Sequence, residues 1–277
     1  MSTTNAPAQV PRSQSRTENK LSTVGILLSE QVKFWSFRST WWCLGIFVVA
    51  QAGLCALTAS TLTSVAVQGQ PQLALTQDGA SASAATFVVL GAHTDVFVIA
   101  ILGVLAISGE YGSGQIRSTL IAVPKRLPML WAKSVVLAGN VFVVAFVAFL
   151  ISFLPVSLIL SADSLKVSLF ASDVIGPFLG ASAYLALISV FALGVGVCLR
   201  SSVAGISTAL GILLVIPTVF AIIKTNWADA AINLLPTTGA GIFGQGSLNP
   251  WLSAVILMGW VGLSLLAAAI LLRNRDL

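Results

Sequence analysis

Long stretches without any charged residue constrain the fold of this chain more than any other feature. They cover residues 41–67, 134–162, 174–199, 201–223 and 230–272. A helix needs about 20 apolar residues to cross the hydrocarbon core of a bilayer, and each of the first four stretches fits one span. Their apolar residues run continuously instead of alternating, which excludes an outer-membrane barrel. The sequence therefore predicts an all-α integral membrane protein.

Six spans are predicted, at about 41–67, 86–109, 134–160, 174–199, 201–223 and 251–272. The second includes His93 and Asp95, because the apolar run that follows Asp95 is too short to cross alone. Residues 1–20 are rich in Ser, Thr, Pro, Gln and Asn, which predicts a disordered cytoplasmic tail. Residues 21–40 are predicted to form an amphipathic interfacial helix, and 41–277 the six-helix transmembrane domain.

The composition excludes a soluble domain, since 57% of the residues are hydrophobic and 8% are charged, against ~25% charged in average soluble proteins. The net charge of +5 could indicate a nucleic-acid binder, but the basic residues lie between spans and indicate orientation instead. The three cysteines lie within apolar runs and are interpreted as small buried hydrophobes.

Twelve of the 14 Lys and Arg residues fall on one side of the predicted spans. An excess of Lys and Arg marks the cytoplasmic side, so both termini are predicted to lie in the cytoplasm of a cell that holds this chain in its plasma membrane. The twelve are Arg12, Arg16, Lys20, Lys33, Arg38, Arg117, Lys125, Arg126, Lys133, Arg200, Arg273 and Arg275, and only Lys166 and Lys224 lie opposite.

No catalytic motif is present: the chain lacks G-x-x-x-x-G-K-[ST], G-x-S-x-G and H-E-x-x-H, and it has one histidine. We therefore expect a protein that is not itself an enzyme. Two predicted cytoplasmic elements attract interest instead. In 24–42, apolar residues recur at helical spacing, while Glu30 and Lys33 can form a weak pair on the helix surface. This helix is either a membrane anchor or a lever that contacts a cytoplasmic partner.

The second element is the loop 110–133. Ile116, Leu120 and Val123 give a short helix an apolar stripe, Pro124 ends it, and Pro128 suits the first turn of the next span. The basic residues around it either anchor to anionic headgroups or belong to a surface that transmits force to a soluble protein.

These two elements resemble the membrane subunits of ABC-2 type transporters, and the resemblance extends over 21–277. It rests on Glu30-x-x-Lys33, Trp35, Arg38 and Trp41, and on Glu110, Gly114, Arg117, Leu120, Val123-Pro124-x-Arg126 and Lys133. Gln115 departs from the threonine that is frequent in the family. The resemblance implies a permease that pairs with a second permease protomer, identical or related, and docks separate ATP-binding subunits.

The family has a coupling helix in the loop between its second and third spans. The resemblance therefore implies that Gly114, Arg117 and Leu120 contact the ATPase, and that Glu110 closes the second span onto the loop. This chain would hold no cofactor, because ATP and Mg²⁺ would bind to the partner. The expected function is movement, most often export, of a drug, lipid, peptide or similar amphipathic substrate.

Segment 233–249 is apolar but interrupted by Pro236, Gly239, Gly241 and Gly244. It is either an ordinary extracellular loop or, as the resemblance implies, a re-entrant pair of short helices near an outer gate. Irregular backbone at membrane depth must be covered by protein or line a cavity.

A carboxylate at membrane depth is expensive and suggests function. His93 and Asp95 are two residues apart and should point to different faces of the helix. Asp95 is expected to stay protonated or to hydrogen-bond to Asn140, Tyr184 or a hydroxyl group. The alternative function is a secondary carrier that uses Asp95 as an ion or proton site, and such a carrier should show an internal repeat. A structural or sensory membrane protein is a third reading.

Overall fold

The computed structural model describes residues 23–67, 80–112, 126–162, 169, 172–223, 225–245 and 248–274. Within these ranges every regular element is helical and no strand occurs. Six helical stretches are long and apolar enough to cross a membrane: Arg38–Thr58, Ala84–Gly112, Leu127–Ile159, Val174–Leu199, Ser202–Ile223 and Pro250–Arg273. The all-helical class and the six helices of membrane-spanning length are thus confirmed among the described residues. The predicted tail 1–20 lies outside the described residues.

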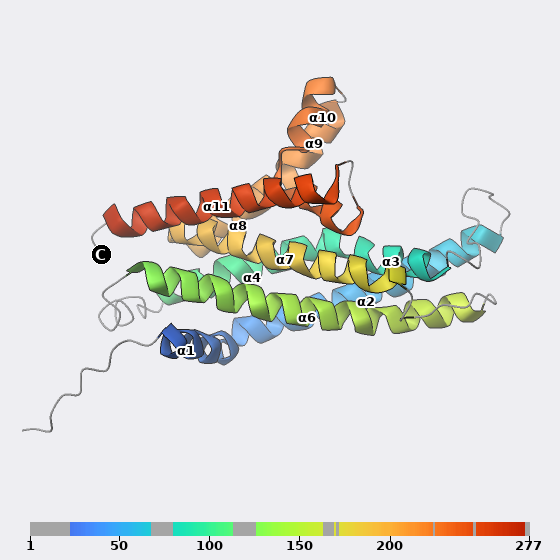
Figure 1. Ribbon diagram of the computed structural model, residues 1–277, viewed down its shortest axis with the longest axis horizontal. Helices are drawn as coiled ribbons and strands as arrows, with labels where there is room; N and C mark the ends of the chain where they lie inside the picture. Colours follow the sequence, from blue (N-terminus) through green and yellow to red (C-terminus); the bar gives the residue numbers. More distant parts are fainter. Residues whose placement is uncertain are drawn as a thin grey trace, which may run out of the picture.

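The helices differ widely in length. In chain order they are α1 (Thr23–Ser36), α2 (Arg38–Val67), α3 (Ala80–Leu90), α4 (Ala92–Gly112), α6 (Arg126–Ala162), α7 (Ser172–Leu199), α8 (Ser202–Leu210), the π-helix η3 (Gly211–Val215), α9 (Ile216–Ile223), α10 (Asn226–Ile232), the 3₁₀-helix η4 (Pro236–Phe243) and α11 (Pro250–Asn274). The long ones lie side by side along the molecule (Figure 1).

The bundle is organised around α7, the most buried of the six spans. It packs against α4, α6, α11 and η4, while α2 covers α4 and α6 from the outside. Phe178, Tyr184, Leu185 and Phe191 of α7 are fully buried in this core. Because neither water nor lipid reaches these side chains, van der Waals packing between helices holds them in place.

Small residues allow α7 to approach its neighbours. A Cβ on Gly196 would lie 2.8 Å from Cγ2 of Ile107 in α4, and one on Gly194 would lie 2.6 Å from the hydroxyl oxygen of Ser264 in α11. A Cβ on Gly180 would lie 3.0 Å from the carbonyl oxygen of Ile242 in η4. These glycine surfaces in the fourth span therefore serve packing within one chain.

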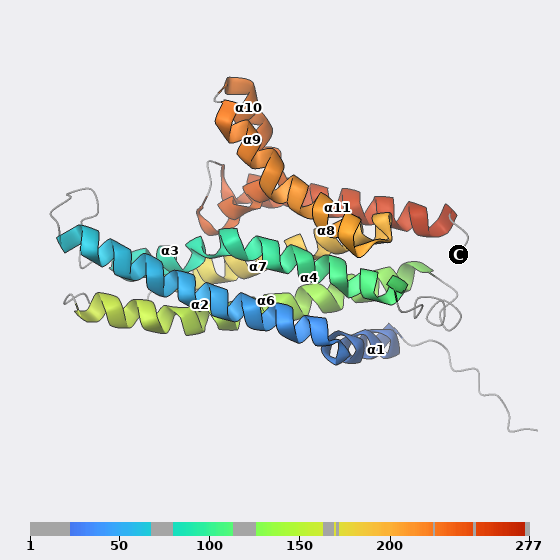
Figure 2. The same cartoon turned by 180° about the vertical axis from the view of Figure 1, so that it is seen from behind.

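The fifth span is the least attached part of the bundle. It consists of α8, η3 and α9, and α9 has no buried residue. Arg200 begins the turn before it with φ of 52°, and its backbone N–H closes α7 by donating to Gly196 O at 3.0 Å. Figures 1 and 2 show α9 and α10 extending away from the other helices. Apolar side chains on such an arm require contact with lipid or protein.

Two predicted spans differ in detail from the observed helices. The third was expected at 134–160, but α6 begins eight residues earlier in sequence, at Arg126, with Pro128 in its first turn. The prediction started the span after the last charged residue, Lys133, but a helix can continue beyond the membrane boundary that such a residue marks. The second span is interrupted by a turn at Gly91, between α3 and α4. No charge or proline marks that break in the sequence.

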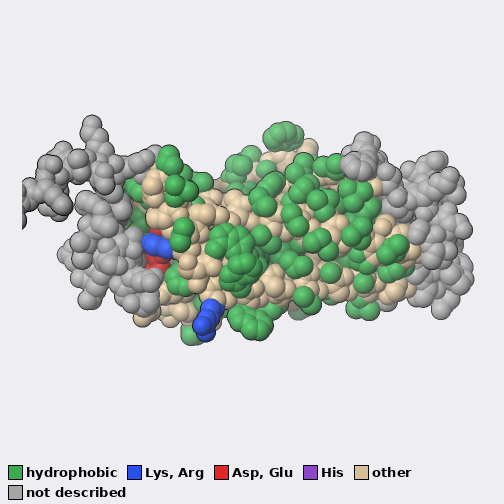
Figure 3. Space-filling view, turned by 90° about the horizontal axis from the view of Figure 1, so that it is seen from below, with side chains coloured by type: hydrophobic (Ala, Val, Ile, Leu, Met, Phe, Trp, Pro, Cys, Tyr) green, Lys and Arg blue, Asp and Glu red, His purple; other side chains and the backbone are tan. Residues whose placement is uncertain are grey.

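The outer surface of the bundle is apolar over most of its length. Figure 3 shows one face on which hydrophobic and uncharged groups predominate and charged side chains are few. Large exposed residues include Val49, Leu57, Val143, Leu158 and Val255. Patches of this size in a soluble protein would drive aggregation, whereas in a bilayer they contact acyl chains.

We predict that the contact between α4 and α7 does not tolerate a methyl group. A Cβ on Gly103 would collide with the backbone carbonyl oxygen of Ser189, whereas a Cβ on Gly109 of the same helix would meet no atom within 4 Å. Gly103→Ala should lower the free energy of unfolding by about 1–3 kcal/mol, and Gly109→Ala should leave it unchanged or raise it slightly. Melting temperatures in detergent test this pair, and equal values for the two variants would contradict it.

Candidate functional site

Four charged side chains from three helices form a cluster at one end of the bundle, and all but the half-buried Lys33 are buried. Glu30 and Lys33 come from α1, Glu110 from the last turn of α4 and Lys133 from the second turn of α6. The Lys133 ammonium lies 2.7 Å from Oε2 of Glu30 and 2.9 Å from Oε1 of Glu110. Lys33 lies 2.9 Å from Oε1 of Glu30 and 3.6 Å from Oε1 of Glu110. We call these four residues the charge cluster.

Burial makes the pairing within the charge cluster obligatory. Glu110 is 0% exposed, Glu30 3% and Lys133 7%. Removing isolated charges from water is strongly unfavourable, so buried charges persist only when they are paired. The cluster holds two carboxylates and two ammonium groups, and Lys133 donates a hydrogen bond to Glu110. Its formal charges therefore balance, and each member requires the others.

The two members of the cluster on α1 hold their charges more firmly than free side chains do. Burial alone would raise the pKa of Glu30, but the charge of Lys133, and the hydrogen bonds from both lysines, bring it below its ordinary value. Burial would lower the pKa of Lys33, but Glu30 and Glu110 raise it above its ordinary value. A carboxyl group whose pKa is lower in the folded state stabilises the fold at pH values above its unfolded-state pKa, and this contribution is lost in acid. A lysine whose pKa is higher in the folded state stabilises the fold at pH values below its unfolded-state pKa, and this contribution is lost in strong alkali. The ion pair between Glu30 and Lys33 therefore holds throughout the neutral range.

A second polar link attaches α1 to α6. Gln31 donates to Asn140 Oδ1 at 2.9 Å, and Asn140 donates back to Gln31 Oε1 at 2.7 Å. Asn140 also donates to the carbonyl oxygen of Val136. The prediction that Asn140 serves as a partner of Asp95 is therefore wrong, because its amide is engaged by Gln31 and Val136 instead.

The orientation of α1 reverses the simplest interpretation of its sequence. The Glu30–Lys33 pair forms as expected, but it lies on the side of α1 that faces the other helices, where Glu30 is buried, and not on the exposed side. Val24, Leu28 and Val32 are exposed on the other side. The spacing of Glu30 and Lys33 predicts that they can pair with each other. It does not predict whether their side of α1 faces the other helices or the surroundings, so the orientation of α1 could not be predicted from the sequence.

Aromatic residues fix the junction between α1 and α2. The indole of Trp41 donates to the carbonyl oxygen of Trp35 at 2.9 Å, and their rings lie 5.0 Å apart between centroids. Phe34 is buried beside them and meets Trp35 edge to face. Arg38, also singled out from the sequence, begins α2 with an exposed side chain. The junction therefore cannot rotate without breaking these contacts.

The loop residues that carry the resemblance divide into two groups. Gly114, Arg117, Leu120 and Pro124 lie outside the described residues, and Arg126 is described only as the first residue of α6. Glu110 and Lys133, which flank this segment in the sequence, are brought together by the charge cluster. The structure thus joins the two ends of the loop to each other and to α1.

The glycine-rich segment packs closely against the bundle. Pro236, Gly239 and Gly241 are buried in η4. A Cβ on Gly239 would lie 2.8 Å from the ring of Tyr184, and a Cβ on Gly241 would lie 3.0 Å from Cβ of Ser253. Gly244 ends the element with φ of 83°, a conformation that favours glycine. The proline and glycines of this segment therefore permit η4 to lie against α7 and α11.

Asp95 lies in a separate polar region inside the bundle. It is 1% exposed, and neither of its carboxylate oxygens has a hydrogen-bond partner among the described residues. The expected bonds to Asn140, Tyr184 or a hydroxyl group are thus absent there. His93, by contrast, is exposed and meets the ring of Phe243 at 6.0 Å, so the two residues do face different ways.

Beside the turn at Gly91 lies a buried polar residue that sequence reasoning missed. Gln51 of α2 donates to the carbonyl oxygen of Val88 at 2.7 Å and to Sγ of Cys55 at 3.2 Å. Its amide oxygen lies against Gly91, where a Cβ would collide with it. Gln51 thus gives the carbonyl oxygen of Val88, three residues before the turn at Gly91, a buried hydrogen-bond donor. The only signal for it was a lone glutamine within an apolar run.

We predict that Lys133 is the residue on which the charge cluster depends. Lys133→Met keeps the length of the side chain but removes the buried cation closest to both Glu30 and Glu110, and leaves them only the partly exposed Lys33. The free energy of unfolding should fall by about 3–5 kcal/mol, measured as a lower melting temperature of the purified protein in detergent.

Arg38→Met is the matched control, because it removes an exposed cation near the same end of the bundle. The double variant Lys133→Met with Glu110→Gln should recover part of the lost stability, since Glu30 keeps Lys33 as its partner. A similar loss from Arg38→Met and Lys133→Met would contradict the central role of Lys133.

Comparison with known proteins assigns no family to this site. A scan against models of known protein families found no match, and a search among curated proteins found none either. The resemblance to ABC-2 type permeases therefore remains an inference from the residues of the interfacial helix and the loop.

Proposed function

We propose that this chain is the permease subunit of an ABC-2 type transporter. Together with a second permease protomer it forms a path for a drug, lipid, peptide or similar amphipathic substrate, which it exports from the cell. Separate ATP-binding subunits supply the energy. The chain resides in the plasma membrane with both termini in the cytoplasm, as the distribution of Lys and Arg favours.

The observation that carries this proposal is the charge cluster. It connects the last turn of α4, the beginning of α6 and the helix α1 through contacts of 2.7–3.6 Å. The loop that resembles a coupling helix lies in sequence between Glu110 and Lys133. A displacement of that loop by an ATPase would therefore move both helix ends and α1 together, because separating them leaves buried charges unpaired.

Rigid connection at one end allows movement to reach the other. α4 packs along α7 over most of its length, and α7 contacts η4 near the opposite end of the span. Closure of an ATPase pair could thus change the position of η4 through two tightly packed helices. In this proposal η4 forms part of the outer gate, and the two positions of the bundle are the states that ATP biases.

The first test is capture of the partner. The tagged chain, purified from its native membrane in mild detergent or nanodiscs, should bring with it a soluble subunit that contains a G-x-x-x-x-G-K-[ST] loop and hydrolyses ATP. Arg117→Glu should reduce the amount captured at least several-fold, since it reverses a charge at the expected contact.

Arg12→Glu is the matched control, because it makes the same change in the N-terminal polar segment and should leave capture unaffected. Absence of any such ATPase, in detergent and in nanodiscs alike, would refute the proposal. Equal capture by wild type and Arg117→Glu would remove Arg117 from the contact.

A second candidate function is favoured by one observation, the unpartnered buried carboxylate of Asp95. In a secondary carrier, this group would bind and release a proton or another cation as the bundle changes state. Asp95→Asn keeps the shape of the side chain and removes its charge. If the chain is such a carrier, ion-coupled uptake or release in proteoliposomes should be abolished while the melting temperature is retained. Transport that continues unchanged in Asp95→Asn would eliminate this function.

A further inference from the structure

An apolar groove lies between α6 and α11 at the end of the bundle that carries the charge cluster. Its volume is about 440 Å³, which falls in the range of pockets that hold small-molecule ligands, about 300–1,000 Å³. The groove exists because α6 and α11 both pack against α7 and scarcely touch each other. Leu130 and Leu265 lie along its floor and sides.

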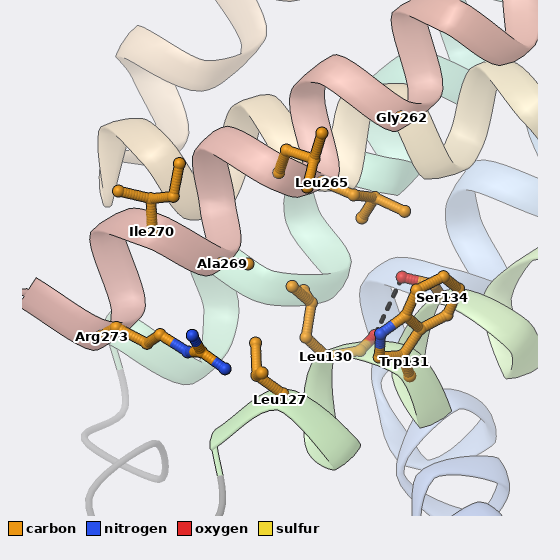
Figure 4. Close-up of a pocket in the computed structure, with 10 residues that line it drawn as sticks. Leu127, Leu130, Trp131, Ser134, Gly262, Leu265, Ala269, Ile270 and Arg273 are labelled. Atoms are coloured by element: carbon orange, nitrogen blue, oxygen red, sulfur yellow. Dashed lines mark hydrogen bonds between the residues drawn. The ribbon is translucent and has the colours of Figure 1, made fainter.

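The groove has one charged side chain in its lining, and it lies at one end. Arg273, in the last turn of α11, extends across the mouth toward Leu127 in the first turn of α6 (Figure 4). Ser134 is the other polar side chain in the lining, and its hydroxyl donates to the carbonyl oxygen of Leu130 on its own helix. The groove thus offers a hydrocarbon-like channel with one cation at its entrance.

The cation at the mouth has no counter-ion in the described part of the chain. Arg273 is exposed and forms no ion pair there, and no carboxylate lines the groove. A guanidinium group binds phosphate in a fork geometry. The mouth lies between the N-terminal end of α6 and the C-terminal end of α11, whose dipoles oppose each other, so the attraction for an anion comes from Arg273 itself.

We propose that this groove binds one anionic phospholipid, with an acyl chain between α6 and α11 and the phosphate at Arg273. A zwitterionic lipid fits less well, because its ammonium group would find no carboxylate in the lining. A second copy of the chain also fits less well, because the carboxylates of Glu30, Asp95 and Glu110 are buried and could not pair with Arg273 across an interface.

The side of the groove that faces away from the bundle supports a lipid occupant. Trp131, Leu266 and Ile270 rim the groove and are exposed. Trp131 lies one turn into α6, the depth at which an indole ring meets both headgroups and acyl chains. The proposal requires that this end of the bundle lies at a membrane surface, and it is independent of ABC transport.

The test is lipid binding to the purified full-length chain. After removal of bound lipid in detergent, phosphatidylglycerol and phosphatidylcholine with identical acyl chains are added, and occupancy is measured by native mass spectrometry. Phosphatidylglycerol should bind more tightly. Arg273→Gln should weaken its binding about tenfold and abolish the preference over phosphatidylcholine.

Two matched controls separate the groove from its surroundings. Arg38→Gln removes another exposed cation outside the groove and should change nothing. Gly262→Leu places a side chain inside the groove and should weaken binding of both lipids, whereas Gly259→Leu, on the same helix but outside the lining, should not. A Cβ at either glycine meets no atom within 4 Å, so both variants should fold.

Three results would overturn the proposal. The first is equal binding of the two lipids by the wild type. The second is an equal loss from Arg273→Gln and Arg38→Gln. The third is a change in the monomer–dimer ratio by Gly262→Leu with lipid binding unaltered, which would assign the groove to a contact between copies of the chain.

Discussion

Lys133 is the charge on which the arrangement of this end of the bundle depends. Its ammonium lies within 3 Å of carboxylates from two other helices, and all three groups are almost fully removed from water. Buried ion pairs add little stability compared with apolar packing of the same volume, but separating one is strongly unfavourable. The value of the charge cluster is therefore geometric: it specifies how α1, α4 and α6 meet, and it resists any motion that would move one without the others.

The remainder of the bundle relies on the opposite principle, contact between uncharged surfaces. Gly103, Gly194 and Gly196 bring α4, α7 and α11 close enough for backbone and side-chain atoms to touch. Because lipid is as apolar as the helices, this contact, rather than escape from water, holds them together. The fifth span lacks such contacts along α9, which explains why it diverges from the bundle (Figure 2).

The sequence allowed the helical class and all six spans to be predicted, because apolar runs are long and local. It also allowed the Glu30–Lys33 pair and the irregular segment before the last span, where η4 lies, to be predicted, since each depends on residues a few positions apart. It could not predict the pairing of Glu110 with Lys133, the Gln31–Asn140 bond or the isolation of Asp95, which depend on how helices rotate about their axes. Opposite charges at both ends of one loop were a signal for the first of these. The break at Gly91 had no comparable signal, because its partner Gln51 lies on another helix.

The two faces of α1 have a consequence for how the protein responds to its lipid environment. Val24, Leu28 and Val32 face outward, while Glu30 and Lys33 bind the ends of α4 and α6. If α1 lies in the headgroup layer, its depth in the membrane depends both on its attachment to α4 and α6 and on its contact with lipid. A change in bilayer thickness displaces the headgroup layer relative to those helices. A displaced headgroup layer would shift α1 relative to α4 and α6, and the ion pairs of the charge cluster would oppose that shift. The thickness of the membrane would thus exert a force on the same helix ends that flank the loop.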